Sequence, residues 1–192
     1  ASDVYKRQIL MTHIGIADFL EVDMARTVAI GIQNFEKVIE SNCFYVDKTD
    51  FIREWWESRD EVTIIARPRR FGKTLNMSML EQFFSVDYAD RGELFEGLSI
   101  WEQEEYRQIQ GSYPVISFSF ANIKETSYEM TRKKMAWILV DLYSKYSFLL
   151  DSDVLTEQDK EYFRQVTADM DDSVATLAIH HLAECLNCLL YT

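Results

Sequence analysis

The chain has 192 residues, of which 47% are hydrophobic and 14% aromatic, and its formal net charge is −12. This length and apolar content suit one domain with a real core and argue against a disordered protein. The negative charge opposes nonspecific binding to nucleic acid and to anionic membranes, since both depend on Lys and Arg.

Cysteine usage and hydropathy predict a cytoplasmic protein. The sequence has no run of 18 or more apolar residues, so we expect no membrane span, and no apolar signal core begins it. Its three cysteines fit a reduced compartment better than a disulfide scaffold. Cys185 and Cys188 form a single C-x-x-C, which without a second pair is weak support for zinc.

The two ends of the chain look foreign to the rest. The sequences ASDVYKRQ and CLLYT resemble translated sequencing-adapter remnants. We therefore interpret the chain as a gene fragment in three parts. Residues 1–28 are an uncertain, partly non-native segment, residues 29–187 are the domain, and residues 188–192 are a non-native tail that includes Cys188.

The first elements of the domain are short. Residues 35–41 read as a helix and residues 44–46 as an extended segment. Thr49 can cap a following helix. That helix carries an apolar stripe at i, i+1, i+4 and i+5, which we assign to the core: Phe51, Ile52, Trp55 and Trp56.

The stretch VTIIARPRRFGKTL, residues 62–75, carries most of the functional signal. Four β-prone residues lead into a tight basic loop that ends in Gly72-Lys73-Thr74, where a helical pattern begins. Gly-Lys-Ser/Thr between a strand and a helix is typical of a phosphate-binding P-loop, although Arg67 stands where that motif has its first glycine. In this hypothesis Gly72 allows close backbone approach, Lys73 binds phosphate and Thr74 is the Mg²⁺ ligand.

The densest group of cations in the chain lies in the same loop. A local positive site in an acidic protein suits a small polyanion such as a nucleotide. For Arg69 and Arg70 the alternative is pairing with surface carboxylates. The candidate residues for binding ATP and Mg are Arg67, Arg69, Arg70, Phe71, Gly72, Lys73 and Thr74.

At these residues the chain resembles the predicted AAA-ATPase-like family of bacteria. The resemblance rests on AIGIQNFEKVIESNCFYVDKTDFI, VTIIARPRRFGKTLNMSMLEQFFS, PVISFSFANIK and LLDSDVLTEQDKEYFRQV, in that order. In that family Arg-Pro-Arg-Arg-Phe-Gly-Lys replaces the glycine-first loop. The resemblance implies ATP as ligand and an α/β fold with a P-loop NTPase-type parallel sheet flanked by helices, here truncated before the acidic-strand half. It also makes Asp47-Lys48-Thr49 a recurrent motif, with packing near the nucleotide base as one role.

The second half of the domain reads as one strand followed by helices. Val115–Phe120 alternates small and large residues, as a second strand would. A long helical pattern starts at Thr126 or Ser127 and runs to about Phe148. The acids of 151–172 read as a solvated face, and a last helix covers 173–186. His180 and His181 point about 100° apart on that helix, so they do not share a metal.

Hydrolysis also needs an acid that helps to hold Mg²⁺. Trp137–Asp141 has the form of four apolar residues before Asp, but its surroundings follow a helical rhythm, so we read Asp141 as a helix residue and keep the acidic strand as the alternative. The resemblance places that strand after the 173–186 helix. We therefore expect the ATP-binding portion of an ATPase that does not itself hydrolyse ATP. The alternatives are a regulatory or interaction module with a structural nucleotide and a small-molecule kinase.

Overall fold

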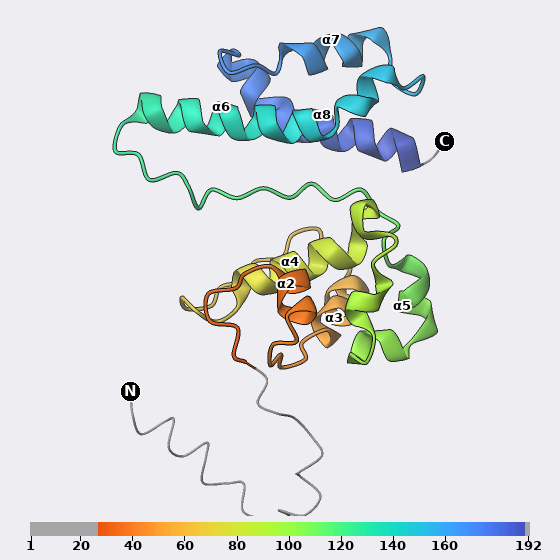
Figure 1. Ribbon diagram of the computed structural model, residues 1–192. Coiled ribbons are helices and arrows are strands. Elements are labelled where there is room, and N and C mark those ends of the chain that lie inside the picture. Colours follow the sequence, from red (N-terminus) through yellow and green to blue (C-terminus); the bar gives the residue numbers. More distant parts are fainter. Residues whose placement is uncertain (1–26, 191–192) are drawn as a thin grey trace, which may run out of the picture. The chain divides into compact units, whose positions relative to one another are not determined.

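The computed structural model describes residues 27–190 as two helical units (Figure 1). Of the described residues, the first unit comprises 27–80 and 93–103, and the second comprises 81–92 and 104–190. The assignments made above for residues 1–26 and 191–192 lie outside the described range. The helices are α2 (Phe35–Glu40), α3 (Asp50–Ser58), α4 (Lys73–Phe84), α5 (Glu104–Ile109), α6 (Tyr128–Lys145), α7 (Glu157–Gln165) and α8 (Asp172–Leu190), with 3-10 turns η1 (Val86–Tyr88), η2 (Gly92–Phe95), η3 (Ser99–Glu102) and η4 (Ser147–Asp151).

The predicted parallel sheet is wrong. Between residues 27 and 190 the backbone forms no strand, only two isolated bridges that join Val28 to Phe44 and Ser85 to Tyr113. Residues 62–66 and 115–120, where strands were predicted, have no regular secondary structure, and Val62 is 78% exposed. A buried parallel strand needs neighbouring strands at its edges and helices on its faces, and the described residues supply no such neighbour. The α/β fold class, with its truncated P-loop NTPase-type sheet, is therefore replaced by a helical architecture.

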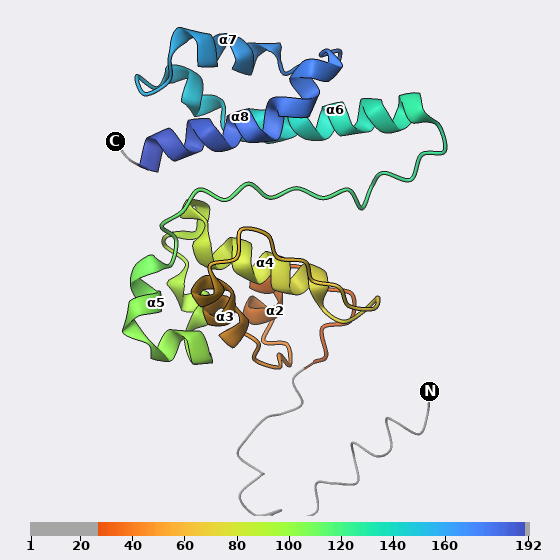
Figure 2. The ribbon, with the colours of Figure 1, turned by 180° about the vertical axis from the view of Figure 1, so that it is seen from behind.

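An aromatic core holds the first unit together. Phe35, at the start of α2, is fully buried and stacks on Phe95 with ring centroids 5.2 Å apart. Its backbone N–H donates to the Ser78 hydroxyl on α4 at 3.0 Å. Ile52 of α3 and Met79 of α4 are also fully buried. Figures 1 and 2 show α2 and α3 beside α4, so this core determines where the start of α4 lies.

The apolar stripe predicted on α3 is buried only in part. Ile52 is fully buried, whereas Trp56 is 37% exposed. Trp55 and Trp56 line a separate cavity of about 350 Å³ together with Arg59 and Asp60. The core assignment is correct for Ile52 and wrong for Trp56, because this short helix turns its second half outward.

Polar side chains join the start of α3 to η3. The Asp47 carboxylate accepts from the N–H groups of Ser99 and Thr49, both at 2.8 Å, and from the Thr49 hydroxyl at 2.7 Å. The fully buried Thr49 hydroxyl also lies 3.1 Å from the Ser99 hydroxyl and accepts from the Ile100 N–H at 3.2 Å. We call this set the Asp47–Thr49 frame. Thr49 stands at the N-cap position of α3, as predicted, but its side chain makes no capping hydrogen bond to the helix.

Burial by itself would raise the pKa of the Asp47 carboxyl, but hydrogen bonds from Ser99 and Thr49 outweigh burial and lower that pKa below its usual value. Asp47 therefore stays ionised at neutral pH. As an ionised acceptor it makes stronger hydrogen bonds to the frame than a neutral group would.

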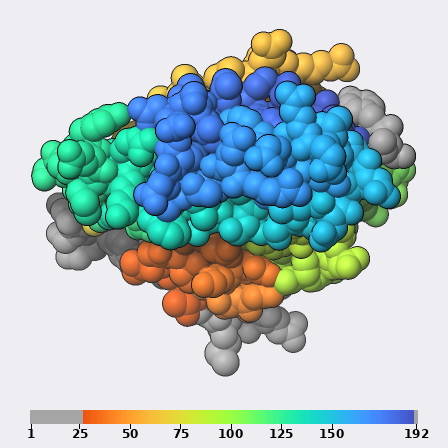
Figure 3. Space-filling view, turned by 90° about the horizontal axis from the view of Figure 1, so that it is seen from above, coloured from red at the N-terminus to blue at the C-terminus, as the bar shows by residue number. Residues whose placement is uncertain are grey.

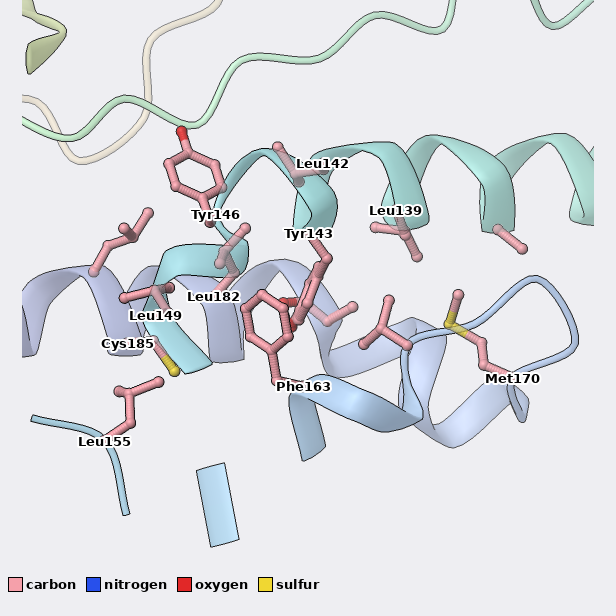
Figure 4. Packing of buried hydrophobic residues seen from close by; sticks show 14 residues of the cluster. Leu139, Leu142, Tyr143, Tyr146, Leu149, Leu155, Phe163, Met170, Leu182 and Cys185 are labelled. Carbon is pink, nitrogen blue, oxygen red and sulfur yellow. The ribbon is translucent and has the colours of Figure 1, made fainter. Parts of the chain in front are cut away.

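The second unit is built on α6, α7 and α8. Figure 4 shows their buried side chains in one cluster, with Tyr143, Phe163 and Leu182 at its centre. The rings of Tyr143 and Phe163 lie 4.6 Å apart, and the Tyr143 hydroxyl donates to the carbonyl of Ala178 at 2.8 Å. In the space-filling view the three helices form one continuous surface, coloured teal to blue (Figure 3). Burial raises the pKa of Tyr143, so its hydroxyl remains a donor.

Local signals in the sequence set the starts of two of these helices. The Ser127 hydroxyl accepts from the Met130 N–H at 3.3 Å, which confirms Ser127 as the start of the long helix. Thr156 and Asp159 form a reciprocal capping box on α7, within the acid-rich stretch read as a solvated face. Asp141 is exposed within α6, so its reading as a helix residue is confirmed.

Within the described residues, α8 is long and apolar enough to cross a membrane by length and composition. The same property is common in core helices. The part of α8 around Ala178, Leu182, Cys185 and Leu186 is buried in the cluster with α6 and α7, which gives the apolar residues a packing role.

Candidate functional site

The basic loop, residues 67–74, borders a cavity of about 830 Å³ in the first unit. Two other segments complete its wall. The first is the stretch 29–33 that precedes α2, and the second is Lys48 beside α3. The residues that line the cavity are 29–33, Lys48, Arg67 and 70–75. The volume is in the range of small-molecule sites.

The backbone of the basic loop changes handedness at two residues. Arg70 has φ = 68° and Gly72 has φ = 73°. Left-handed backbone is costly for a residue with a Cβ, and strain of this kind concentrates at functional sites. Where right-handed and left-handed backbone conformations alternate along a turn, successive N–H groups point to the same side. This is the geometry of anion-binding loops.

The loop leads directly into the N-terminus of α4. The carbonyl of Gly72 accepts the first intrahelical hydrogen bond, from the N–H of Asn76 at 2.9 Å. The N–H groups of Lys73, Thr74 and Leu75 precede that bond and have no intrahelical acceptor. All three residues line the cavity, so α4 presents free donors and the positive end of its dipole there.

Lys73 folds back over the beginning of the loop. Its ammonium donates to the carbonyls of Arg67 at 2.6 Å and Pro68 at 2.9 Å. An ammonium has three donors, so one remains for a ligand. The two carbonyl bonds hold the charge in place before any ligand arrives.

The cations of this site have no carboxylate partner among the described residues. None of the ion pairs found between residues 27 and 190 includes Arg67, Arg69, Arg70 or Lys73. In that range the structure therefore does not bear out the alternative of carboxylate pairing for Arg69 and Arg70. The described lining of the cavity also holds no Asp or Glu.

Six of the seven candidate residues meet at the cavity. Arg67, Arg70, Phe71, Gly72, Lys73 and Thr74 line it, whereas Arg69 lies outside its lining. Sequence reasoning missed the wall at 29–33, although these residues lie within the stretch that carried the family resemblance. For the Asp47-Lys48-Thr49 motif it offered packing near the nucleotide base, and did not expect Lys48 in the wall beside the basic loop.

A second group of ligand-type side chains lies in the second unit. Asp159 on α7 is 3.5 Å from the His181 Nε2 on α8, and the Cys185 sulfur is 3.7 Å from the His181 Nδ1. Burial raises the pKa of the Cys185 thiol to about 11, so it stays protonated at neutral pH. Cys185 is buried and Cys188 exposed. We read Asp159, His181 and Cys185 as a polar contact between two helices.

The chemistry of the first unit is therefore that of a cationic loop at a helix N-terminus, beside a cavity large enough for a nucleotide. The model of the predicted AAA-ATPase family matches residues 29–180. The chain belongs to this family.

One relative comes from Azotobacter chroococcum mcd 1, where it is described as an uncharacterized protein in the vnfD 5′ region. It is 34% identical over 96 residues, which are 50% of this chain and 17% of the relative. The chain therefore spans a minor part of that relative's length. No solved structure matches the chain.

Proposed function

We propose that this chain binds ATP and Mg²⁺ through the basic loop, as the nucleotide-binding part of a cytoplasmic ATPase. The observation that carries the proposal is that Arg67, Arg70 and Lys73, which form no ion pair within residues 27–190, line a cavity of about 830 Å³ at the N-terminus of α4. In a chain of net charge −12, uncompensated cations at one cavity favour an anionic ligand.

Each loop residue has a role in this proposal. The N–H groups at the start of α4 face the phosphates, and Gly72 leaves room for them because it has no side chain. The third donor of the Lys73 ammonium contacts a phosphate oxygen. Thr74 is exposed and lines the cavity, and its hydroxyl would hold Mg²⁺ together with phosphate oxygens and water, a ligand set that Mg²⁺ accepts.

Replacing Lys73 by Ala tests this binding mode. Loss of a charge-assisted hydrogen bond costs roughly 1.5–3 kcal/mol, so we expect about ten- to a hundredfold weaker Mg-ATP binding. Calorimetric titration of the full chain measures it. Lys37→Ala, at an exposed position of α2, is the matched control and should bind like wild type. Equal affinities for Lys73→Ala and wild type, or no binding by wild type, would contradict the proposal.

We further propose that this chain does not turn ATP over. The described cavity lining lacks a carboxylate that could hold Mg²⁺ or position water, and Asp141 is an exposed residue of α6. Phosphate release should therefore match the buffer blank, and Asp141→Asn should bind Mg-ATP like wild type. ATPase activity that disappears in both Lys73→Ala and Asp141→Asn would rule this out.

A regulatory or interaction module with a structural nucleotide has the same binding site. The two functions differ in ATP turnover, which an ATPase assay of a longer protein that contains this domain measures. Neither nucleic-acid nor membrane binding is part of the proposal, because the site suits a small anion and the rest of the chain is acidic.

A further inference from the structure

Lys48 and Lys73 reach the basic loop from two separate segments of the chain. The Lys73 ammonium is bonded to the carbonyls of Arg67 and Pro68, where the loop begins. The Lys48 Nζ lies 3.7 Å from the point that a Cβ on Gly72 would occupy, where the loop ends. Both side chains line the same cavity.

The backbone on either side of Lys48 is fixed. Asp47 and Thr49 are its two neighbours, and the Asp47–Thr49 frame ties both to η3 through Ser99 and Ile100. The Lys48 carbonyl accepts from the Phe51 N–H at 3.0 Å, which adds a third restraint. A frame of this kind limits the positions that the long Lys48 side chain can reach.

Lys48 also has no opposing charge within the described part of the chain. None of the ion pairs between residues 27 and 190 includes it, although Asp47 and Asp50 are near it in sequence. Asp47 is engaged by the frame, and Asp50 pairs with Arg53 at 3.3 Å. Glu54 lines a neighbouring cavity of about 290 Å³ with Lys48, but within the described residues it forms no ion pair with the Lys48 ammonium, which leaves that ammonium available to a ligand.

We propose that Lys48 is a second phosphate-binding residue of the site, supplied by a separate segment and positioned by the Asp47–Thr49 frame. This inference rests on the proposed function and deepens it. Lys48 and Lys73 come from separate segments to the same cavity, and a chain of two or three phosphates offers them more oxygen atoms to contact than a single phosphate does. In this proposal Lys48 therefore favours polyphosphates over a monophosphate.

The test is titration of Mg-ATP, Mg-ADP and AMP into wild type, Lys48→Met, Lys48→Arg and Lys37→Met. We expect Lys48→Met to bind ATP and ADP at least about tenfold more weakly than wild type does, because the variant loses a charge-assisted hydrogen bond to phosphate. AMP binding should change little. Lys48→Arg keeps the charge and should recover most of the affinity, and Lys37→Met should match wild type.

A second measurement separates a ligand contact from a structural role. Amine labelling read by mass spectrometry should show that Mg-ATP protects Lys48 and Lys73 but leaves Lys37 reactive. Wild-type affinity in Lys48→Met, or unprotected Lys48 beside protected Lys73, overturns this inference and leaves the proposed function intact. Absence of ATP binding by wild type overturns both.

Discussion

Replacing Gly111 by Ala should destabilise the second unit by about 3 kcal/mol or more. Gly111 is buried with φ = 65°, a backbone conformation that costs a residue with a Cβ about 1–2 kcal/mol. A Cβ there would lie 2.3 Å from the Cα and 3.0 Å from the N of Ala89. These are backbone atoms, so the overlap is relieved only by moving the chain.

The backbone around Gly111 resists that movement. The Gly111 N–H donates to the Phe83 carbonyl at 2.8 Å, and the Tyr113 N–H donates to Phe84 at 2.9 Å. The side chain of Gln110 donates to the Tyr88 carbonyl at 2.7 Å. Shifting the chain away from Ala89 would stretch these bonds, so steric strain and lost hydrogen bonding add to the conformational cost.

Gly97→Ala is the matched control for Gly111→Ala. Gly97 has a similar φ of 76°, but a Cβ there meets nothing within 4 Å. Gly97→Ala should therefore lower the free energy of unfolding only by the cost of the left-handed backbone, about 1–2 kcal/mol. Urea unfolding followed by circular dichroism measures both changes. Equal losses in the two variants would show that the contact with Ala89 does not restrict position 111.

The second large effect is expected for Leu182→Ala. Leu182 is fully buried at the contact of α8 with α6 and α7 (Figure 4). Truncating a buried leucine removes favourable apolar burial and leaves a cavity, which costs about 2–5 kcal/mol. Tyr143 and Phe163 are large ring systems in that cluster and cannot easily collapse into the space, so we expect the upper half of the range.

Leu177→Ala makes the same chemical change on the same helix. Leu177 is 53% exposed, so its loss should change the free energy of unfolding by no more than about 0.5 kcal/mol. Both residues have the same helix propensity, which removes that term from the comparison. A loss for Leu182→Ala as small as that for Leu177→Ala would mean that α8 does not pack on the cluster as described.

The residues of the candidate site were accessible from sequence, but their arrangement was not. The order of Gly72, Lys73 and Thr74 before a helical pattern is a local signal, and α4 does begin at Lys73. The place of Lys48 in the cavity wall could not be derived from the Asp47-Lys48-Thr49 motif, because it depends on hydrogen bonds from Ser99 and Ile100, about fifty residues further along the chain, to the neighbours of Lys48. The left-handed backbone of Arg70 was equally invisible, since arginine has no preference for it.

By itself, the sequence determined the features that depend on neighbours along the chain. The long helix after Ser127, the helical state of Asp141 and the basic loop before α4 followed from capping, periodicity and composition, because α-helical hydrogen bonds join residues four apart. Only the tertiary structure decided the state of residues 62–66 and 115–120, because a strand takes its hydrogen bonds from another segment and the described chain offers none. The same holds for the cavity, whose walls at 29–33, Lys48 and the basic loop are brought together by the aromatic core and the Asp47–Thr49 frame.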